Sequence, residues 1–226
     1  DERRRIRHER HAIAGRRSYL FAFIDDHSRL IPGYRWGRAE DSLRLEAAFR
    51  RGLAARGIPR RLYVDNGSAF VAAPLQRACA VLGIQLVHSR PGQPAGRGKI
   101  ERFFRTTWSA LNRMVFTSGA PMSLWEEICT HAVWIRNRIG YPALEMKTPH
   151  FIRFGVETND FPRVRILFSP CWPVTDAYYN KFSAATDECK WLGISEDIRG
   201  TIVYRPSDGK VFAAGMLSVL ENTTET

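Results

Sequence analysis

A strand followed by a turn and a helix, at residues 61–83, is the feature that most constrains the fold. Residues 61–64 form a short apolar run that Asp65-Asn66-Gly67 ends, and a helical pattern then continues until Gly83. Residues 84–88 have the composition of another short strand. Because strands that alternate with helices are typical of α/β proteins, the sequence predicts an α/β domain.

The flanking segments extend this domain in both directions. Residues 19–24 and 30–36 have the aromatic and β-branched composition of two antiparallel strands, and residues 41–56 have the apolar spacing of an amphipathic helix. Residues 89–98 form a Pro/Gly loop, after which a long helix is expected from about Lys99 toward Met114.

The predicted secondary structure changes after these elements. Residues 122–139 have helical spacing up to the break at Pro142, and short β-like runs follow from about Arg163. The predicted organisation has three parts: residues 1–18 as a basic arm or truncated first hairpin, residues 19–157 as a core with C-terminal helices, and residues 163–222 as a small β module.

Composition restricts the class of partner. Lys and Arg number 34 against 23 Asp and Glu, which gives a net charge of +11 and indicates an anionic partner, either nucleic acid or an acidic membrane surface. No run approaches the roughly 18 consecutive apolar residues that a membrane span needs. The four cysteines are scattered without a CxxC pair, which favours reduced structural thiols over a zinc or disulfide framework.

Two carboxylates are placed where phosphoryl-transfer chemistry could use them. Asp65 follows a strand at a glycine turn, and Glu101 falls in the first turn of a helix, with 35 residues between them. Mg²⁺ prefers oxygen ligands, and two such ions held by a few carboxylates can run phosphoryl transfer on DNA. The cations that surround Glu101 would contact the DNA backbone: Arg97, Lys99, Arg102 and Arg105. Each motif alone has an ordinary structural interpretation, a turn for Asp-Asn-Gly and a solvated ion-pair face for the helix.

Taken together, these motifs resemble those of a known family. Tyr63 to Phe70, Pro91-Gly92-Gln93-Pro94 and Gly98 to Arg102 resemble the second and third motifs of D,D(35)E integrases and transposases, and residues 23–29 resemble the end of that family's second strand. The resemblance covers roughly residues 19–116 and implies a ribonuclease H-like mixed sheet flanked by helices. Residues 191–204 are similar to the SH3-like β-barrel that follows copia-type retroelement cores, whereas Gly98 to Glu101 is closer in texture to bacterial insertion-sequence transposases.

The resemblance also implies an activity. It predicts metal-dependent DNA strand cleavage and strand transfer, with Mg²⁺ or Mn²⁺ held by Asp65, Glu101 and a first aspartate, on element ends and target DNA, by a homo-oligomer. A eukaryotic retroelement would place the protein in the nucleus, and a bacterial element in the cytoplasm or nucleoid. In the family the first aspartate lies in the middle of the first strand. Three sources are weighed: Asp1, Asp25, which matches a turn-capping strand end, and a residue upstream of the chain.

Three rival functions are open, the first of them because the carboxylate set is incomplete. A decayed or domesticated core would bind DNA without turnover, and a β module that docks partners inside a polyprotein would be an interaction protein. A ribonuclease acting on hybrid duplexes would share the fold and the metals, but the Lys99 to Arg102 context favours integration.

Overall fold

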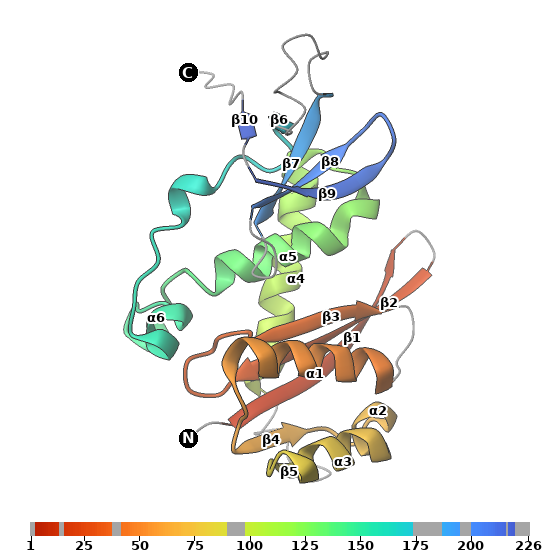
Figure 1. Cartoon of the computed structure of the whole chain (residues 1–226), viewed down its shortest axis with the longest axis vertical. Coiled ribbons are helices and arrows are strands. Elements are labelled where there is room, and N and C mark those ends of the chain that lie inside the picture. Colours follow the sequence, from red (N-terminus) through yellow and green to blue (C-terminus); the bar gives the residue numbers. More distant parts are fainter. Residues whose placement is uncertain are drawn as a thin grey trace. The chain divides into compact units, whose positions relative to one another are not determined.

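The computed structural model describes residues 3–13, 16–37, 42–89, 98–173, 187–194, 200–215 and 217–219. It divides into two compact units. Unit 1 consists of Asp1–Trp108 with Asn137–Thr158, and unit 2 consists of Ser109–Arg136 with Asn159–Thr226. Each unit contains one five-stranded sheet (Figure 1).

Unit 1 is built on a mixed sheet with the strand order β3-β2-β1-β4-β5. Its antiparallel strands are β1 (Arg3–Ile13), β2 (Arg16–Asp25) and β3 (Gly33–Gly37), whereas β4 (Arg61–Val64) and β5 (Gln85–His88) run parallel to β1. This is the α/β arrangement with a mixed sheet that the sequence predicts.

The central strand of this sheet comes from the segment expected to be a basic arm or a truncated first hairpin. Arg3–Ile13 pairs antiparallel with β2, the next strand along the chain, and parallel with β4 on its other side. The backbone ladder uses N–H and C=O groups that every residue but proline carries, so a strand without apolar alternation still pairs once its neighbours are in place. Arg3–Ile13 is therefore the central strand of the described sheet.

Helices cover one face of the sheet in unit 1. The helices α1 (Ser42–Arg56), α2 (Ser68–Val71) and α3 (Ala73–Val81) contact one another, and α1 packs on β2 and β3. A Cβ atom on Gly33 would lie 2.6 Å from the backbone oxygen of Ala48 in α1, so only glycine permits this close approach. The core between these elements contains Phe21, Phe23, Leu45, Ala48, Phe49, Leu62, Val64, Ala69, Phe70, Leu75, Cys79 and Ile84.

The long helix α4 (Gly98–Ser118) contributes its residues up to Trp108 to unit 1. Its buried side chains include Ile100, Phe103 and Phe104. The helix begins one residue before the predicted start and ends four residues after the predicted end.

Asn137 closes unit 1 through a buried amide. Its Oδ1 accepts a hydrogen bond from the N–H of Ile31 at 2.9 Å, and its Nδ2 donates to the oxygen of Ile31 at 3.2 Å. The same residue's backbone oxygen accepts from the N–H of His150, in α6 (Pro149–Phe154), at 3.0 Å. The Asn137 side chain therefore satisfies both the N–H and the C=O of Ile31, as a paired strand would.

Unit 2 pairs a helix with an antiparallel sheet. Between α4 and α6 lie the short 3₁₀ turn η2 (Met122–Leu124), the helix α5 (Trp125–Arg136) and the 3₁₀ turn η3 (Pro142–Leu144), so the predicted single helix at residues 122–139 is shorter than expected. The sheet has the order β10-β6-β7-β8-β9, and α5 packs on β7. Its strands are β6 (Pro170–Pro173), β7 (Cys189–Ile194), β8 (Thr201–Arg205), β9 (Lys210–Ala214) and β10 (Leu217–Val219).

The β module predicted at residues 163–222 thus contains a half-barrel sheet, while its closure into an SH3-like barrel stays a prediction. The β-like runs expected from about Arg163 begin only at β6, Pro170–Pro173. The 3₁₀ turn η4 (Phe161–Arg163) and a positive φ of 67° at Phe168 precede it, and an L residue with positive φ cannot continue a strand.

A buried histidine joins α5 to β7 in unit 2. His131 is 2% exposed, its Nδ1 accepts a hydrogen bond from the N–H of Ile194 at 3.3 Å, and its ring packs edge-on against Trp191. Burial lowers the pKa of His131 to about 4, so the ring is neutral at pH 7. Gly193 has a φ of 138°, and a Cβ there would lie 2.3 Å from the Cβ of His131.

The four cysteines are buried and unbridged, as the sequence predicts. Cys171 and Cys189 lie opposite each other on β6 and β7. Burial raises the pKa of Cys129 and of Cys171 to about 12. Among the described residues, no helix is both long enough and apolar enough to cross a membrane.

Candidate functional site

Asp65 stands at the carboxyl end of β4 in a fixed turn. Its Oδ1 accepts a hydrogen bond from the N–H of Gly67 at 2.9 Å, and the side chain is half-buried. The Nδ2 of Asn66 donates to the backbone oxygen of Ser89 at 3.0 Å, and the N–H of Ser89 donates to the oxygen of Val64 at 2.8 Å. The end of β4 is therefore tied to the residue that follows β5, which holds the Asp65 carboxylate at one edge of the sheet.

Glu101 lies in the first turn of α4, where the positive end of the helix dipole favours a carboxylate. It is half-buried, and the neighbouring Ile100 is buried. Arg102 and Arg105 are exposed on the same helix. Arg97, predicted to contact DNA, lies outside the described residues, as does the Pro/Gly motif before it.

Lys99, predicted to contact DNA, forms an ion pair within unit 1. Its Nζ forms an ion pair with Asp26 Oδ1 at 2.9 Å, with exposed fractions of 37% and 15% for the two side chains. This pair joins the start of α4 to the turn after β2. Because the two residues are 73 positions apart, no local signal in the sequence could have identified the pair, and part of the Lys99 charge is neutralised within the protein.

Asp25 was one candidate for the first carboxylate, and the geometry argues against it. It is 7% exposed, and it accepts hydrogen bonds from the N–H of Ser28 at 2.9 Å and the Oγ of Ser28 at 2.5 Å. Across the sheet, Asp25 pairs with Arg4, which also pairs with Leu62. Asp25 is thus three residues, roughly 10 Å along the strands, from the level of Asp65. It caps a turn, as its motif indicates.

The acidic site is incomplete within the described residues. They contain no group of three or more His, Cys, Asp or Glu side chains arranged to hold a metal ion. Asp1, another candidate for the first carboxylate, lies outside the described residues. Asp65 and Glu101 therefore lie on separate elements of unit 1, and the described part of the chain contributes no third carboxylate to a metal-binding group with them.

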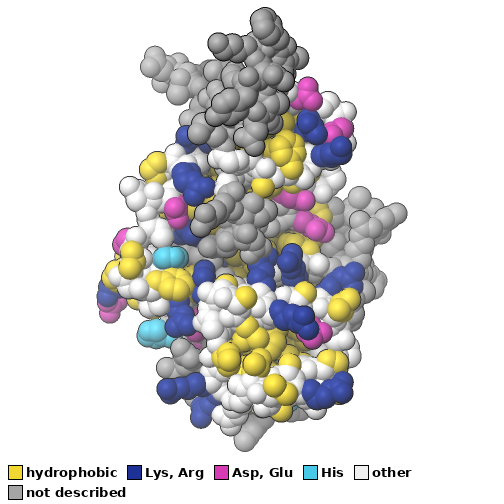
Figure 2. Space-filling view, in the orientation of Figure 1, with side chains coloured by type: hydrophobic (Ala, Val, Ile, Leu, Met, Phe, Trp, Pro, Cys, Tyr) yellow, Lys and Arg dark blue, Asp and Glu magenta, His cyan; other side chains and the backbone are white. Residues whose placement is uncertain are grey.

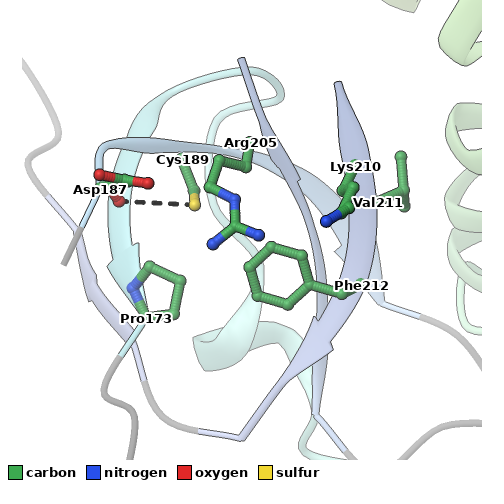
Figure 3. Close-up of a pocket in the computed structure, with 7 residues that line it drawn as sticks. All are labelled: Pro173, Asp187, Cys189, Arg205, Lys210, Val211 and Phe212. Carbon is green, nitrogen blue, oxygen red and sulfur yellow. Dashed lines mark hydrogen bonds between the residues drawn. The ribbon is translucent and has the colours of Figure 1, made fainter. Parts of the chain in front are cut away.

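Unit 2 contains a cavity that the sequence did not indicate. It measures about 470 Å³ and is lined by Pro173, Asp187, Cys189, Arg205, Lys210, Val211 and Phe212 (Figure 3). The guanidinium of Arg205 lies 5.3 Å from the centre of the Phe212 ring and forms two hydrogen bonds with Asp208, at 3.0 and 2.9 Å. Those bonds hold the pKa of Asp208 well below its usual range. The guanidinium of Arg205, which lines the cavity, is therefore already paired with the carboxylate of Asp208.

Basic side chains are spread over the surface. On the face drawn in Figure 2, Lys and Arg side chains cover more of the surface than Asp and Glu and do not gather into one patch. The basic side chains seen on this face are thus dispersed, which suits contact with an extended polyanion better than binding of a small anion.

The chain is similar in sequence to proteins of known families. Residues 8–94 match the family described as "Integrase core domain". The chain is 36% identical to the transposase of transposon Tn552 from Staphylococcus aureus over 99 residues, which are 40% of this chain and 21% of that protein. It is 28% identical to a retrovirus-related Pol polyprotein of transposon TNT 1-94 from Nicotiana tabacum over 216 residues, 94% of this chain and 16% of that one. The chain thus spans about a fifth or less of these two relatives.

Solved structures show the same fold. The HTLV-2 integrase catalytic core domain, solved in complex with magnesium, matches with a TM-score of 0.56 and 20% identity over 67% of this chain and 95% of that one. The simian T-cell lymphotropic virus intasome, solved with the PP2A regulatory subunit B56 gamma, matches with a TM-score of 0.62 and 15% identity over 98% of this chain and 79% of that one. The predicted ribonuclease H-like fold is confirmed by these structures, and residues 8–94 of the chain are similar to the integrase core domain.

Proposed function

We propose that this chain is the DNA-binding core of an integration or transposition system and that it holds DNA without cutting it. The observation that carries the proposal is the incomplete acidic site, since the described residues bring no third acidic ligand to Asp65 and Glu101. The family relationship and the net charge of +11 support DNA as the partner.

The two-metal chemistry expected from the family does not fit the described residues. A pair of divalent ions needs several oxygen ligands that also leave sites for water and phosphate. Asp25, the other described candidate for the first carboxylate, is buried and bonded to Ser28 in its turn. The Mg²⁺ or Mn²⁺ site predicted from the sequence therefore has two carboxylates here.

Metal-dependent strand cleavage and strand transfer form the second candidate function. It is favoured by one observation, the position of Asp65 at a strand end and of Glu101 in the first turn of a helix, where both carboxylates are held by regular structure. In this alternative both residues are catalytic metal ligands, and another chain or an undescribed residue supplies the third carboxylate. Assembly as a homo-oligomer on paired DNA ends belongs to both candidates. The structural relatives include a trimeric form and an intasome.

DNA binding is the first test. Fluorescence anisotropy with a labelled duplex should show affinity that falls steeply as salt rises, because phosphate contacts release counterions. Arg102→Glu and Arg105→Glu should each weaken binding, whereas Arg50→Glu, at an exposed position on α1, should change it less. A chain that does not bind duplex DNA would refute both candidate functions.

Nicking of the same duplex with Mn²⁺ separates the two candidates. The proposed function predicts no metal-dependent product from the wild-type chain. If product forms, and both Asp65→Asn and Glu101→Gln abolish it, strand cleavage is an activity of this chain and the DNA-holding proposal is wrong.

A further inference from the structure

Two cationic side chains of unit 1 meet on one acidic residue. Lys99 Nζ lies 2.9 Å from Asp26 Oδ1, and Arg29 Nη1 lies 3.5 Å from the same oxygen. Both side chains also donate to the backbone oxygen of Asp26, Lys99 at 3.5 Å. Asp26 thus presents two oxygens to an ammonium and a guanidinium group, as a phosphodiester presents its two non-bridging oxygens to such cations.

The turn after β2 holds Asp26 and Arg29 close together. The buried Asp25 accepts hydrogen bonds from the N–H and the Oγ of Ser28, and the N–H of Arg29 donates to the backbone oxygen of Asp25 at 3.0 Å. Arg29 has a positive φ of 62°, which is uncommon for a residue with a side chain. These contacts fix the turn, so the carboxylate and the guanidinium are positioned before any ligand arrives.

Lys99 comes to this turn from another element. It lies in the first turn of α4, where the positive end of the helix dipole also attracts an anion. Arg102 is exposed three residues farther along, so the two side chains lie on the same side of the helix. The exposed fractions are 37% for Lys99, 25% for Arg29 and 15% for Asp26, which leaves the two cations accessible from solvent. The group therefore continues the surface of α4 that the proposed function assigns to DNA.

We propose that Lys99 and Arg29 form a binding site for one DNA phosphate and that Asp26 fills this site when DNA is absent. The inference rests on the proposed function and assigns one of its phosphate contacts. When DNA binds, a phosphate oxygen takes the place of Asp26 Oδ1 at the two cations, and no covalent bond changes. The carboxylate of Asp26 lowers the affinity for DNA, because its contact with the cations is broken when the phosphate enters.

Fluorescence anisotropy of the full chain with a labelled duplex, repeated at several salt concentrations, tests this exchange. Each phosphate contact contributes about 0.9 to the slope of log affinity against log salt concentration. Lys99→Gln should therefore make the slope shallower by about 0.9 and weaken binding at low salt. Asp26→Asn should tighten binding by about fivefold, because a partly buried ion pair no longer has to be broken. Its slope should stay at the wild-type value, because the complex contains the same phosphate contacts.

The matched control is Glu46→Gln, which makes the same change in charge in unit 1 and removes the ion pair with Arg50, 3.3 Å long, on α1. It should change the affinity by about twofold at most, because only the overall charge differs. The double variant Asp26→Asn with Lys99→Gln should lose the gain of Asp26→Asn. A purely structural tie between the turn and α4 would instead lower the melting temperature of both single variants and leave the salt slope unchanged.

The inference is overturned if Lys99→Gln keeps the wild-type slope, or if Glu46→Gln tightens binding as much as Asp26→Asn does. The first criterion compares only wild type with Lys99→Gln, so it decides the question even if Asp26→Asn does not fold. DNA binding by wild type with an unchanged slope in Lys99→Gln would refute this inference and leave the proposed function standing. A wild-type chain that does not bind DNA would refute both.

Discussion

Acidification should destabilise unit 2 through His131. Its folded pKa of about 4 lies below the ordinary value of 6.5, because burial disfavours the charged ring. The unfolded chain then binds more protons, so stability is complete above the unfolded pKa and falls as the pH drops from 6.5 toward 4. Between pH 7 and pH 5 this single residue should cost about 2 kcal/mol of unfolding free energy.

The assay is urea unfolding followed by tryptophan fluorescence, since Trp134 and Trp191 both lie against the His131 ring. The variant His131→Gln keeps a hydrogen-bond acceptor for Ile194 but cannot titrate. It should be less stable than wild type at pH 7 and should lose most of the difference between pH 7 and pH 5. His27→Gln, at an exposed turn position, serves as the control and should keep that difference. Equal pH dependence in wild type and His131→Gln would show that another group is responsible.

Three further changes test unit 1. Asn137→Ala leaves two buried backbone groups unpaired and should lower the free energy of unfolding by about 2–4 kcal/mol, measured by urea titration. Gly33→Ala places a methyl group against the backbone of α1 and should lower the free energy of unfolding by about 1–3 kcal/mol in the same assay. An unchanged free energy of unfolding would show that α1 shifts to accept the methyl group without cost. Ser28→Ala removes a donor from the buried Asp25 carboxylate and should lower the melting temperature, whereas Ser28→Thr should retain part of the stability.

The elements that carry Asp65 and Glu101 were predictable from local sequence. The strand at residues 61–64 is bounded by an Asp-Asn-Gly turn, and its bounds agree with β4. The start of α4 follows a loop whose proline and glycine residues oppose helix formation, and the prediction missed it by one residue. In both cases the signal lies within a few residues of the boundary.

The central strand and the tertiary contacts were not predictable in this way. β1 contains five arginines among its eleven residues and lacks the apolar alternation by which strands are recognised, so its pairing depends on neighbours supplied by distant sequence. The ion pair of Lys99 with Asp26 and the pairing of Asn137 with Ile31 join residues 73 and 106 positions apart. The role of Lys99 in DNA binding stays a prediction. Its ammonium group contacts Asp26 within the protein.

The path of the chain between the two units limits how this protein can be cut or recombined. The chain leaves unit 1 after Trp108, returns at Asn137, and leaves again after Thr158, so three peptide connections cross the boundary. A fragment ending at residue 158 would keep α5 but lose β7, and with it the strand that covers His131 and Trp134. Unit 2 therefore cannot be gained, lost or exchanged as a C-terminal cassette, and gene fusions that preserve both cores must keep residues 109–136 and 159–226 from one parent.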